Sequence, residues 1–121
     1  MNKKNLLIVG ATSGIMISCL KNFLNQKFNI FASYRDNQSL KNIPEKIRKS
    51  KNIKLFKLDL NSDDKNILET LKKNHIKADA IINAIGGSFG IKEYPIEMES
   101  WQKMLNINIL KHILINNYFL D

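Results

Sequence analysis

The sequence predicts an α/β protein with one open, doubly wound parallel sheet and helices on both faces of that sheet. Two observations carry this prediction. Apolar residues switch along the chain between the two-residue period of strands and the 3.6-residue period of helices, in the order β-α-β-α-β-α-β-α. The connections between these elements are short, which favours parallel strands joined by right-handed crossovers. We therefore expect a single domain over residues 1–121.

The first predicted strand and the first predicted helix flank a glycine. Residues Asn5–Val9 form a short apolar run that ends at Gly10, which is typical of a strand buried on both faces. Thr12 and Ser13 offer hydroxyl groups that can cap a helix. A second strand is expected over residues 28–34. The helix between the two strands has an apolar face, which consists of Met16, Cys19, Leu20, Phe23 and Leu24.

The rest of the chain continues the alternation. Residues 44–50 predict a short helix with Pro44 in its first turn, and residues 53–58 predict a third strand. Ser62 is the predicted cap of the next helix, whose charges match the helix dipole, with Asp63 and Asp64 at its start and Lys72 and Lys73 at its end. The remaining predicted elements are a strand over 80–82, a glycine-rich loop over 86–90, and one long helix or two abutting helices over 98–120.

Composition excludes several classes of protein. With 44% hydrophobic and 25% charged residues and one cysteine, the chain is neither disordered, nor collagen-like, nor a disulfide scaffold. Its apolar runs are only a few residues long, far short of the roughly 20 residues that a bilayer requires. The N-terminal segment has no adequate signal-peptide core. We expect a cytoplasmic protein without a membrane span, in which Cys19 is a small buried hydrophobic residue.

The net charge of +8 raises the question of a nucleic-acid partner. Among the 19 basic residues only Arg35 and Arg48 are arginines, the residue type that phosphate and base recognition favours. The lysines are scattered, without long runs or interleaved aromatic residues. Solvated lysine faces explain this pattern better, so nucleic-acid binding is the minor alternative.

Ligands of open parallel sheets bind beyond the C-terminal ends of the strands. After the first strand, Gly10 and Gly14 occupy the first two glycine positions of the pattern G-x-x-x-G-x-G, and Met16 replaces the third. This segment resembles the glycine-rich turn of the short-chain dehydrogenase/reductase family, and the resemblance covers nearly the whole chain. Met16 either weakens cofactor binding or turns into the core. The resemblance implies a Rossmann-like sheet of order 3-2-1-4 and a nicotinamide dinucleotide whose pyrophosphate lies against Gly10, Thr12, Ser13, Gly14 and Ile15.

Arg35 follows the second strand, 21 residues after Gly14. An acidic residue at this position accepts the ribose 2′-hydroxyl of NAD, whereas a basic residue meets the 2′-phosphate of NADP. The resemblance therefore implies NADP as the cofactor, with NAD as the alternative. The neighbouring Asp36 would repel the phosphate, and Arg35 could instead be an ordinary surface arginine in a loop.

Two further segments resemble cofactor contacts of the family. Asp59 resembles its adenine-contacting aspartate, with Leu60 supplying a backbone amide and apolar cover; the alternative is a turn residue or cap. The segment Asn83-Ala84-Ile85-Gly86 resembles the family's Asn-Asn-Ala-Gly, which lines the adenosine. The cofactor contacts implied here are Asn83, Ala84 and Gly86.

Asn108 resembles the family's catalytic asparagine, because it stands seven residues after Trp101 in a predicted helix. The resemblance implies that Asn108 holds a helix kink and a water for proton relay. The family's Ser and Tyr-x-x-x-Lys residues are absent, since no tyrosine of this sequence has a lysine four residues later. We expect a truncated oxidoreductase that acts on a small-molecule substrate only when the missing part is supplied. The alternative is a non-catalytic dinucleotide-binding module or a decayed remnant.

The two histidines offer no substitute catalytic or metal site. His75 lies in a predicted loop and His112 on a lysine-flanked helix turn, so both are expected to face solvent, and neither has a second ligand at metal spacing. We also expect the chain alone to self-associate or to be only marginally folded. The family's sheet continues beyond the fourth strand, so here that strand becomes an unpaired apolar edge, and apolar residues of the segment 107–120 lose neighbours.

Overall fold

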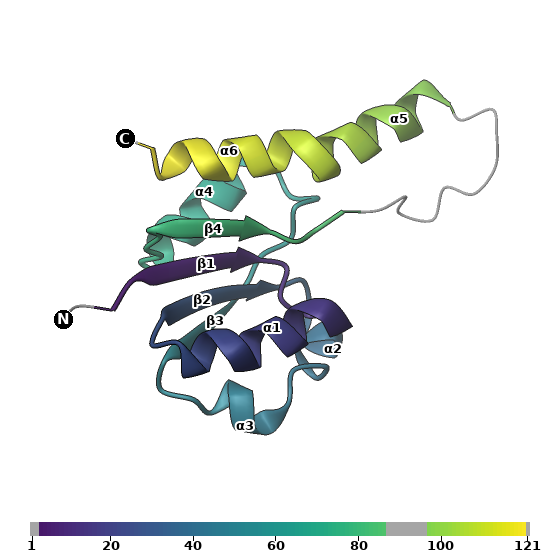
Figure 1. The fold of residues 1–121 in the computed structure, drawn as a ribbon. Coiled ribbons are helices and arrows are strands. Elements are labelled where there is room, and N and C mark those ends of the chain that lie inside the picture. Colours follow the sequence, from purple (N-terminus) through teal and green to yellow (C-terminus); the bar gives the residue numbers. More distant parts are fainter. Residues whose placement is uncertain (1–2, 87–96, 121) are drawn as a thin grey trace.

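Four parallel strands lie between two layers of helices in the computed structural model, which describes residues 3–86 and 97–120 (Figure 1). The strands are paired in the order β3-β2-β1-β4, which confirms the predicted sheet. In the register, Leu7 of β1 is paired with Phe31 of β2 and with Ile81 of β4. The bounds are β1 Asn5–Val9, β2 Asn29–Tyr34, β3 Ile53–Lys57 and β4 Ala80–Asn83.

The helices cover both faces of the sheet, as a doubly wound fold requires. Helices α1, α2 and α3 lie on one side of the sheet, and α4 lies on the other with the long C-terminal helix formed by α5, a π-helical turn and α6 (Figure 1). Their bounds are α1 Gly14–Asn25, α2 Asn37–Leu40, α3 Glu45–Arg48, α4 Asp64–Lys73, α5 Met98–Leu105, the π-turn Asn106–Leu110 and α6 Lys111–Tyr118.

The central strand β1 separates two apolar clusters. Leu7 and Val9 belong to the cluster that β1 shares with α4 and the C-terminal helix, where Ile67, Leu71 and Ile115 are fully buried. The alternating side chains of β1 face the opposite cluster, which contains Leu6, Ile8, Met16, Leu20, Ile43 and Ile47. The prediction of a strand buried on both faces is therefore correct. No helix of the described residues is long and apolar enough to cross a membrane.

Helix starts differ from the prediction at α4. Ser13 caps α1 as expected, because its Oγ accepts the Met16 amide at 3.3 Å. The cap of α4 is Asp63, whose Oδ1 accepts the Asn66 amide at 2.7 Å, so the assignment to Ser62 is wrong. Ser62 instead donates its hydroxyl and its amide to the carbonyl of Asp59, which closes the turn that leads into the helix.

The two short helices α2 and α3 also differ from the prediction. Pro44 precedes α3 as its cap instead of occupying its first turn. Helix α2 was not predicted, because its four residues are too few to show a period; it is held by a reciprocal capping box between Asp36 and Ser39. Of the predicted glycine-rich loop, residues 87–90 lie outside the described part of the chain.

The C-terminal helix runs on through a π-helical turn. Residues 98–118 form consecutive helical elements, so of the two options the single long helix is closer to the structure. The π-turn Asn106–Leu110 contains Asn108, and such turns often mark functional positions in helices. Lys111 joins this helix to α4 through an ion pair of 2.7 Å with Asp64.

Candidate functional site

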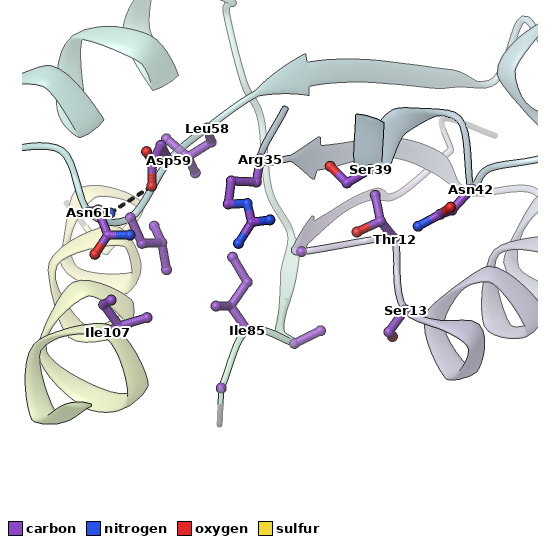
Figure 2. A pocket seen from close by; sticks show the side chains of 14 residues that line it. Thr12, Ser13, Arg35, Ser39, Asn42, Leu58, Asp59, Asn61, Ile85 and Ile107 are labelled. Carbon is purple, nitrogen blue, oxygen red and sulfur yellow. Dashed lines mark hydrogen bonds between the residues drawn. The ribbon is translucent and has the colours of Figure 1, made fainter. Parts of the chain in front are cut away.

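A pocket of about 390 Å³ opens at the C-terminal edge of the sheet, where all four parallel strands end (Figure 2). Eight of the eleven predicted cofactor residues line it: Gly10, Thr12, Ser13, Arg35, Asp59, Leu60, Ala84 and Gly86. Six other lining residues were not predicted, namely Ser39, Asn42, Leu58, Asn61, Ile85 and Ile107. Gly14, Ile15 and Asn83 do not line this pocket.

The turn after β1 requires glycine at position 10. Gly10 has a φ of +90°, a conformation that residues with a Cβ rarely adopt. A Cβ there would also lie 2.3 Å from Cγ1 of Ile85. The turn is tied to β2, because the Gly10 amide donates to the Ser33 Oγ at 2.8 Å and the Ala11 amide donates to the Ser33 carbonyl at 2.9 Å. Ser33 is fully buried. Its role in holding the turn depends on these contacts between β1 and β2, which the sequence did not predict.

The N-terminus of α1 borders the pocket through its cap, Ser13. The first amides of a helix lack partners within the helix and carry partial positive charge, which favours an anion. A Cβ on Gly14 would meet no atom within 4 Å, and the side chain of Ile15 is 79% exposed, so both positions adjoin open space. Met16 points the other way, into the core, where it is buried against the sheet.

Arg35 contributes the cationic group of the pocket. Its Nε lies 3.1 Å from Oδ2 of Asp36, and its side chain remains 67% exposed. The pKa of Asp36 is lowered from its ordinary value of 3.8, chiefly because its carboxylate accepts the Ser39 backbone amide and also because it accepts a hydrogen bond from Arg35. Asp36 is thus a helix cap whose charge is already engaged by two donors.

Asp59 begins a turn and also lines the pocket. Its Oδ1 accepts the Asn61 amide at 2.9 Å, which makes it the first residue of a turn (Figure 2). It also lines the pocket, between the buried side chains of Leu58 and Leu60. The turn therefore holds a carboxylate at the pocket wall with apolar side chains on either side.

The segment after β4 connects the pocket to the C-terminal helix. The Ala84 amide donates to the Val9 carbonyl at 2.8 Å, which continues the pairing of β4 with β1. Asn83 lies away from the pocket, with its Nδ2 3.3 Å from Oδ1 of Asn116. A Cβ on Gly86 would lie 2.8 Å from Oδ1 of Asn108, so glycine permits the close approach of this predicted catalytic side chain.

Asn108 and His112 lie one helical turn apart on the C-terminal helix and face residues Ile85 and Gly86, which follow β4. Asn108 donates its Nδ2 to the Met104 carbonyl at 2.9 Å, next to the π-turn. His112 is only 6% exposed, with Nε2 2.7 Å from the Ile85 carbonyl, so the expectation that it faces solvent is wrong. The neighbouring Lys111 suggested that His112 is exposed. However, His112 stands four residues after Asn108 and three residues before Ile115, so it shares the inward-facing side of the helix with them. His75 is exposed, as predicted.

The described residues contain no group of three His, Cys, Asp or Glu side chains that could hold a metal ion. A parallel sheet of order 3-2-1-4, with a glycine turn and a helix N-terminus at its C-terminal edge, defines a Rossmann-type fold. The short chain dehydrogenase family model matches residues 4–121. The chain therefore belongs to the short chain dehydrogenase family.

Solved structures share this fold. An ElxO variant with NADPH bound is 27% identical, over 97% of this chain and 49% of its own, with a TM-score of 0.74. Serine dehydrogenase from Escherichia coli is 21% identical, over 96% of this chain and 54% of its own, with a TM-score of 0.76. A short chain dehydrogenase from Leptospira borgpetersenii with bound NAD+ is 18% identical, over 98% and 45%, with a TM-score of 0.72. The chain thus spans about half the length of each.

Proposed function

We propose that this chain binds a nicotinamide dinucleotide in the pocket at the C-terminal edge of the sheet and prefers NADP to NAD. The observation that carries the proposal is the convergence on one pocket of Gly10, Ser13, Arg35 and Asp59, which come from the ends of β1, β2 and β3. The ElxO structures with NADP and NADPH bound support this choice of cofactor.

The residues of the pocket fit the adenosine end of such a cofactor. The amides at the start of α1 offer hydrogen-bond donors to the pyrophosphate. The Arg35 guanidinium suits a 2′-phosphate, because arginine binds phosphate through paired donors. The Asp59 carboxylate can accept from an adenine amino group, and Leu58 and Leu60 cover the ring.

The proposed activity of the whole protein is oxidation or reduction of a small-molecule substrate, with hydride transfer supplied by the bound nicotinamide. Asn108 lies beside Gly86, which lines the pocket. Its proposed role is to hold the π-turn and a water for proton transfer. The second candidate is a non-catalytic dinucleotide-binding module, which the same pocket would also support.

Calorimetric titration of the chain with NADP and NAD at fixed ionic strength tests the proposal. We expect saturable 1:1 binding of NADP that inorganic pyrophosphate alone does not reproduce. The chain carries a net charge of +8, which attracts anions without specificity. If pyrophosphate displaced bound NADP as effectively as free NADP does, the binding would be such non-specific attraction, and this result would contradict the proposal. Assay of NADPH oxidation with a panel of aldehydes and ketones separates the enzyme from the non-catalytic module.

A further inference from the structure

Three consecutive residues after β4 line the pocket, namely Ala84, Ile85 and Gly86. Figure 2 shows the Ile85 side chain between the wall that carries Asp59 and the wall that carries Ser13. A shift of this segment would therefore change the pocket along both walls, and the position of the segment matters for any ligand that contacts the two.

Two hydrogen bonds fix the backbone of this segment. The Ala84 amide donates to the Val9 carbonyl of the central strand at 2.8 Å. The Ile85 carbonyl lies 2.7 Å from Nε2 of His112 on α6. Because a carbonyl oxygen accepts and does not donate, Nε2 carries the proton in this bond. The sheet thus holds one residue of the segment, and a histidine of the C-terminal helix holds the next.

The second ring nitrogen of His112 has no partner among the described residues. The side chain is 6% exposed, and Nδ1 is buried without a hydrogen bond. With the proton on Nε2, Nδ1 of the neutral ring is an acceptor. Protonation would turn Nδ1 into a buried N–H donor without an acceptor and would add a positive charge in the protein interior, and both changes cost free energy. A protonated ring avoids this cost by turning toward solvent, which releases the Ile85 carbonyl.

The described surroundings of His112 do not offset such a charge. Lys111 precedes it on the helix and forms an ion pair of 2.7 Å with Asp64 of α4, the helix that packs against α6. The other charged residues of α4 are exposed. Strands β1 and β4 and the segment 84–86 contain no titratable side chain. The bond to Ile85 is therefore suited to the neutral histidine.

We propose that His112 is a positioning residue of the cofactor pocket, whose neutral form holds the segment 84–86 in the arrangement that binds the dinucleotide. His112 acts only through the Ile85 carbonyl. This inference rests on the proposed cofactor site, and it makes the affinity of that site depend on pH. Affinity falls as the pH decreases through the range in which histidine side chains gain a proton, about pH 8 to pH 5.

The first experiment measures NADP affinity of the wild type, His112→Gln and His112→Leu from about pH 8 to about pH 5. Glutamine can place an amide donor near the position of Nε2 and does not titrate, whereas leucine removes the donor. At the highest pH we expect His112→Gln to match the wild type and His112→Leu to bind about tenfold more weakly, the effect of one lost hydrogen bond.

As the pH decreases, the affinity of the wild type should fall about tenfold relative to that of His112→Gln. Comparison of the two proteins at each pH cancels the titration of the 2′-phosphate itself. Circular dichroism verifies that each protein is folded at each pH. A purely structural role of His112 would lower the affinity of both variants at every pH, without rescue by glutamine, and this result would overturn the inference.

His75→Asn is the matched control. It replaces the other histidine of the chain, which is exposed and does not line the pocket. Asparagine suits the φ of 52° at this position, because it adopts positive φ more readily than most residues. The pH profile of this variant should coincide with that of the wild type.

The second experiment uses only the wild type, so it decides the question even if neither His112 variant folds. Because proton and cofactor binding are linked, a proton that weakens NADP binding is itself bound more weakly when NADP is present. In an NMR titration, saturating NADP should make His112 gain its proton at lower pH, while His75 is unaffected. The negative charge of NADP alone would shift His112 in the opposite direction. An unchanged or upward shift would overturn the inference.

The outcomes separate this inference from the proposed function. Saturable NADP binding with the same pH profile in the wild type and His112→Gln overturns the role of His112 and leaves the cofactor site standing. Failure of NADP to bind at any pH overturns the cofactor site, and the role of His112 with it.

Discussion

Arg35 is the residue on which the proposed choice of cofactor depends. It lines the pocket with a largely exposed side chain and shares its guanidinium with Asp36. The Arg35 Nε donates to Asp36 Oδ2, which leaves the terminal amino groups of the guanidinium as donors for a further anion. The other carboxylate oxygen of Asp36 accepts the Ser39 amide. The Arg35 guanidinium and the Ser39 amide, which both contact the Asp36 carboxylate, therefore offset the repulsion expected between Asp36 and a 2′-phosphate.

We predict that Arg35→Ala abolishes the preference for NADP over NAD. The charge-assisted contact with a 2′-phosphate contributes about 1.5–3 kcal/mol, so NADP affinity should fall by that amount while NAD affinity is unchanged. Isothermal titration of both cofactors measures the difference. Arg48→Ala is the control, because it removes the same charge from an exposed position on α3 outside the pocket. Equal affinities for the two cofactors in the wild type would rule out this role of Arg35.

We predict that the capping box of α2 weakens at acid pH. Because the pKa of Asp36 is lowered in the folded chain, the ionised carboxylate stabilises the fold. This contribution is complete above the ordinary value of 3.8 and is lost as the pH falls through the lower pKa of the folded state. An NMR titration of the Ser39 amide should show a midpoint below 3.8, absent from Asp36→Asn. A midpoint at or above that value would contradict the prediction.

At the scale of elements, α1 illustrates how one helix serves both the core and the pocket. Its N-terminus borders the pocket through Ser13, and its inward face buries Met16 and Leu20 against the sheet. Met16 stands where the family turn has its third glycine. Its side chain lies in the core, which favours the interpretation that the chain tolerates this substitution without obstructing the pocket.

We predict that Met16→Ala destabilises the fold without changing cofactor affinity. Loss of this buried side chain should lower the free energy of unfolding by about 2–5 kcal/mol, as measured by chemical denaturation. Ile15→Ala is the matched control; since Ile15 is 79% exposed, its effect should stay within about 0.5 kcal/mol. Markedly tighter NADP binding by Met16→Ala would instead show that the methionine obstructs the cofactor.

At the scale of the whole molecule, the sheet ends at β4 in the described residues, and β4 is paired on one side only, by β1. The C-terminal helix adds exposed apolar side chains on its outer surface. These residues are Leu105, Ile109, Leu110 and Ile113, each about half exposed. An unpaired strand beside such a surface favours association with another chain.

We predict that the 121-residue chain self-associates in solution. Sedimentation velocity should detect species larger than the monomer, and Ile113→Lys should shift them toward the monomer without loss of helical signal, since Ile113 is 48% exposed. A lysine at Ile81 would reduce association only together with stability, because Ile81 packs against the core. A cooperatively unfolding wild-type monomer at high concentration would refute the prediction.

Much of this molecule could be predicted from local patterns. Apolar periodicity located the four strands to within one or two residues, and the alternation of elements together with the family resemblance predicted the sheet order. Most of the cofactor residues predicted from strand ends do meet in one pocket, because parallel strands bring their C-terminal ends to the same edge. These features depend on backbone period and connectivity, which the order of residues encodes directly.

Contacts between distant segments could not be predicted in this way. Ser33 holds the Gly10 turn from another strand, and Ile107 reaches the pocket from the C-terminal helix. His112 lies in a helical segment whose mixed polar and apolar residues did not show which side of the helix meets the sheet. The packing of that helix buries His112 against Ile85. The apolar period of a sequence shows that a helix has an apolar face. It does not show which element covers that face. The packing of the helices on the sheet decides this, and with it the shape of the pocket.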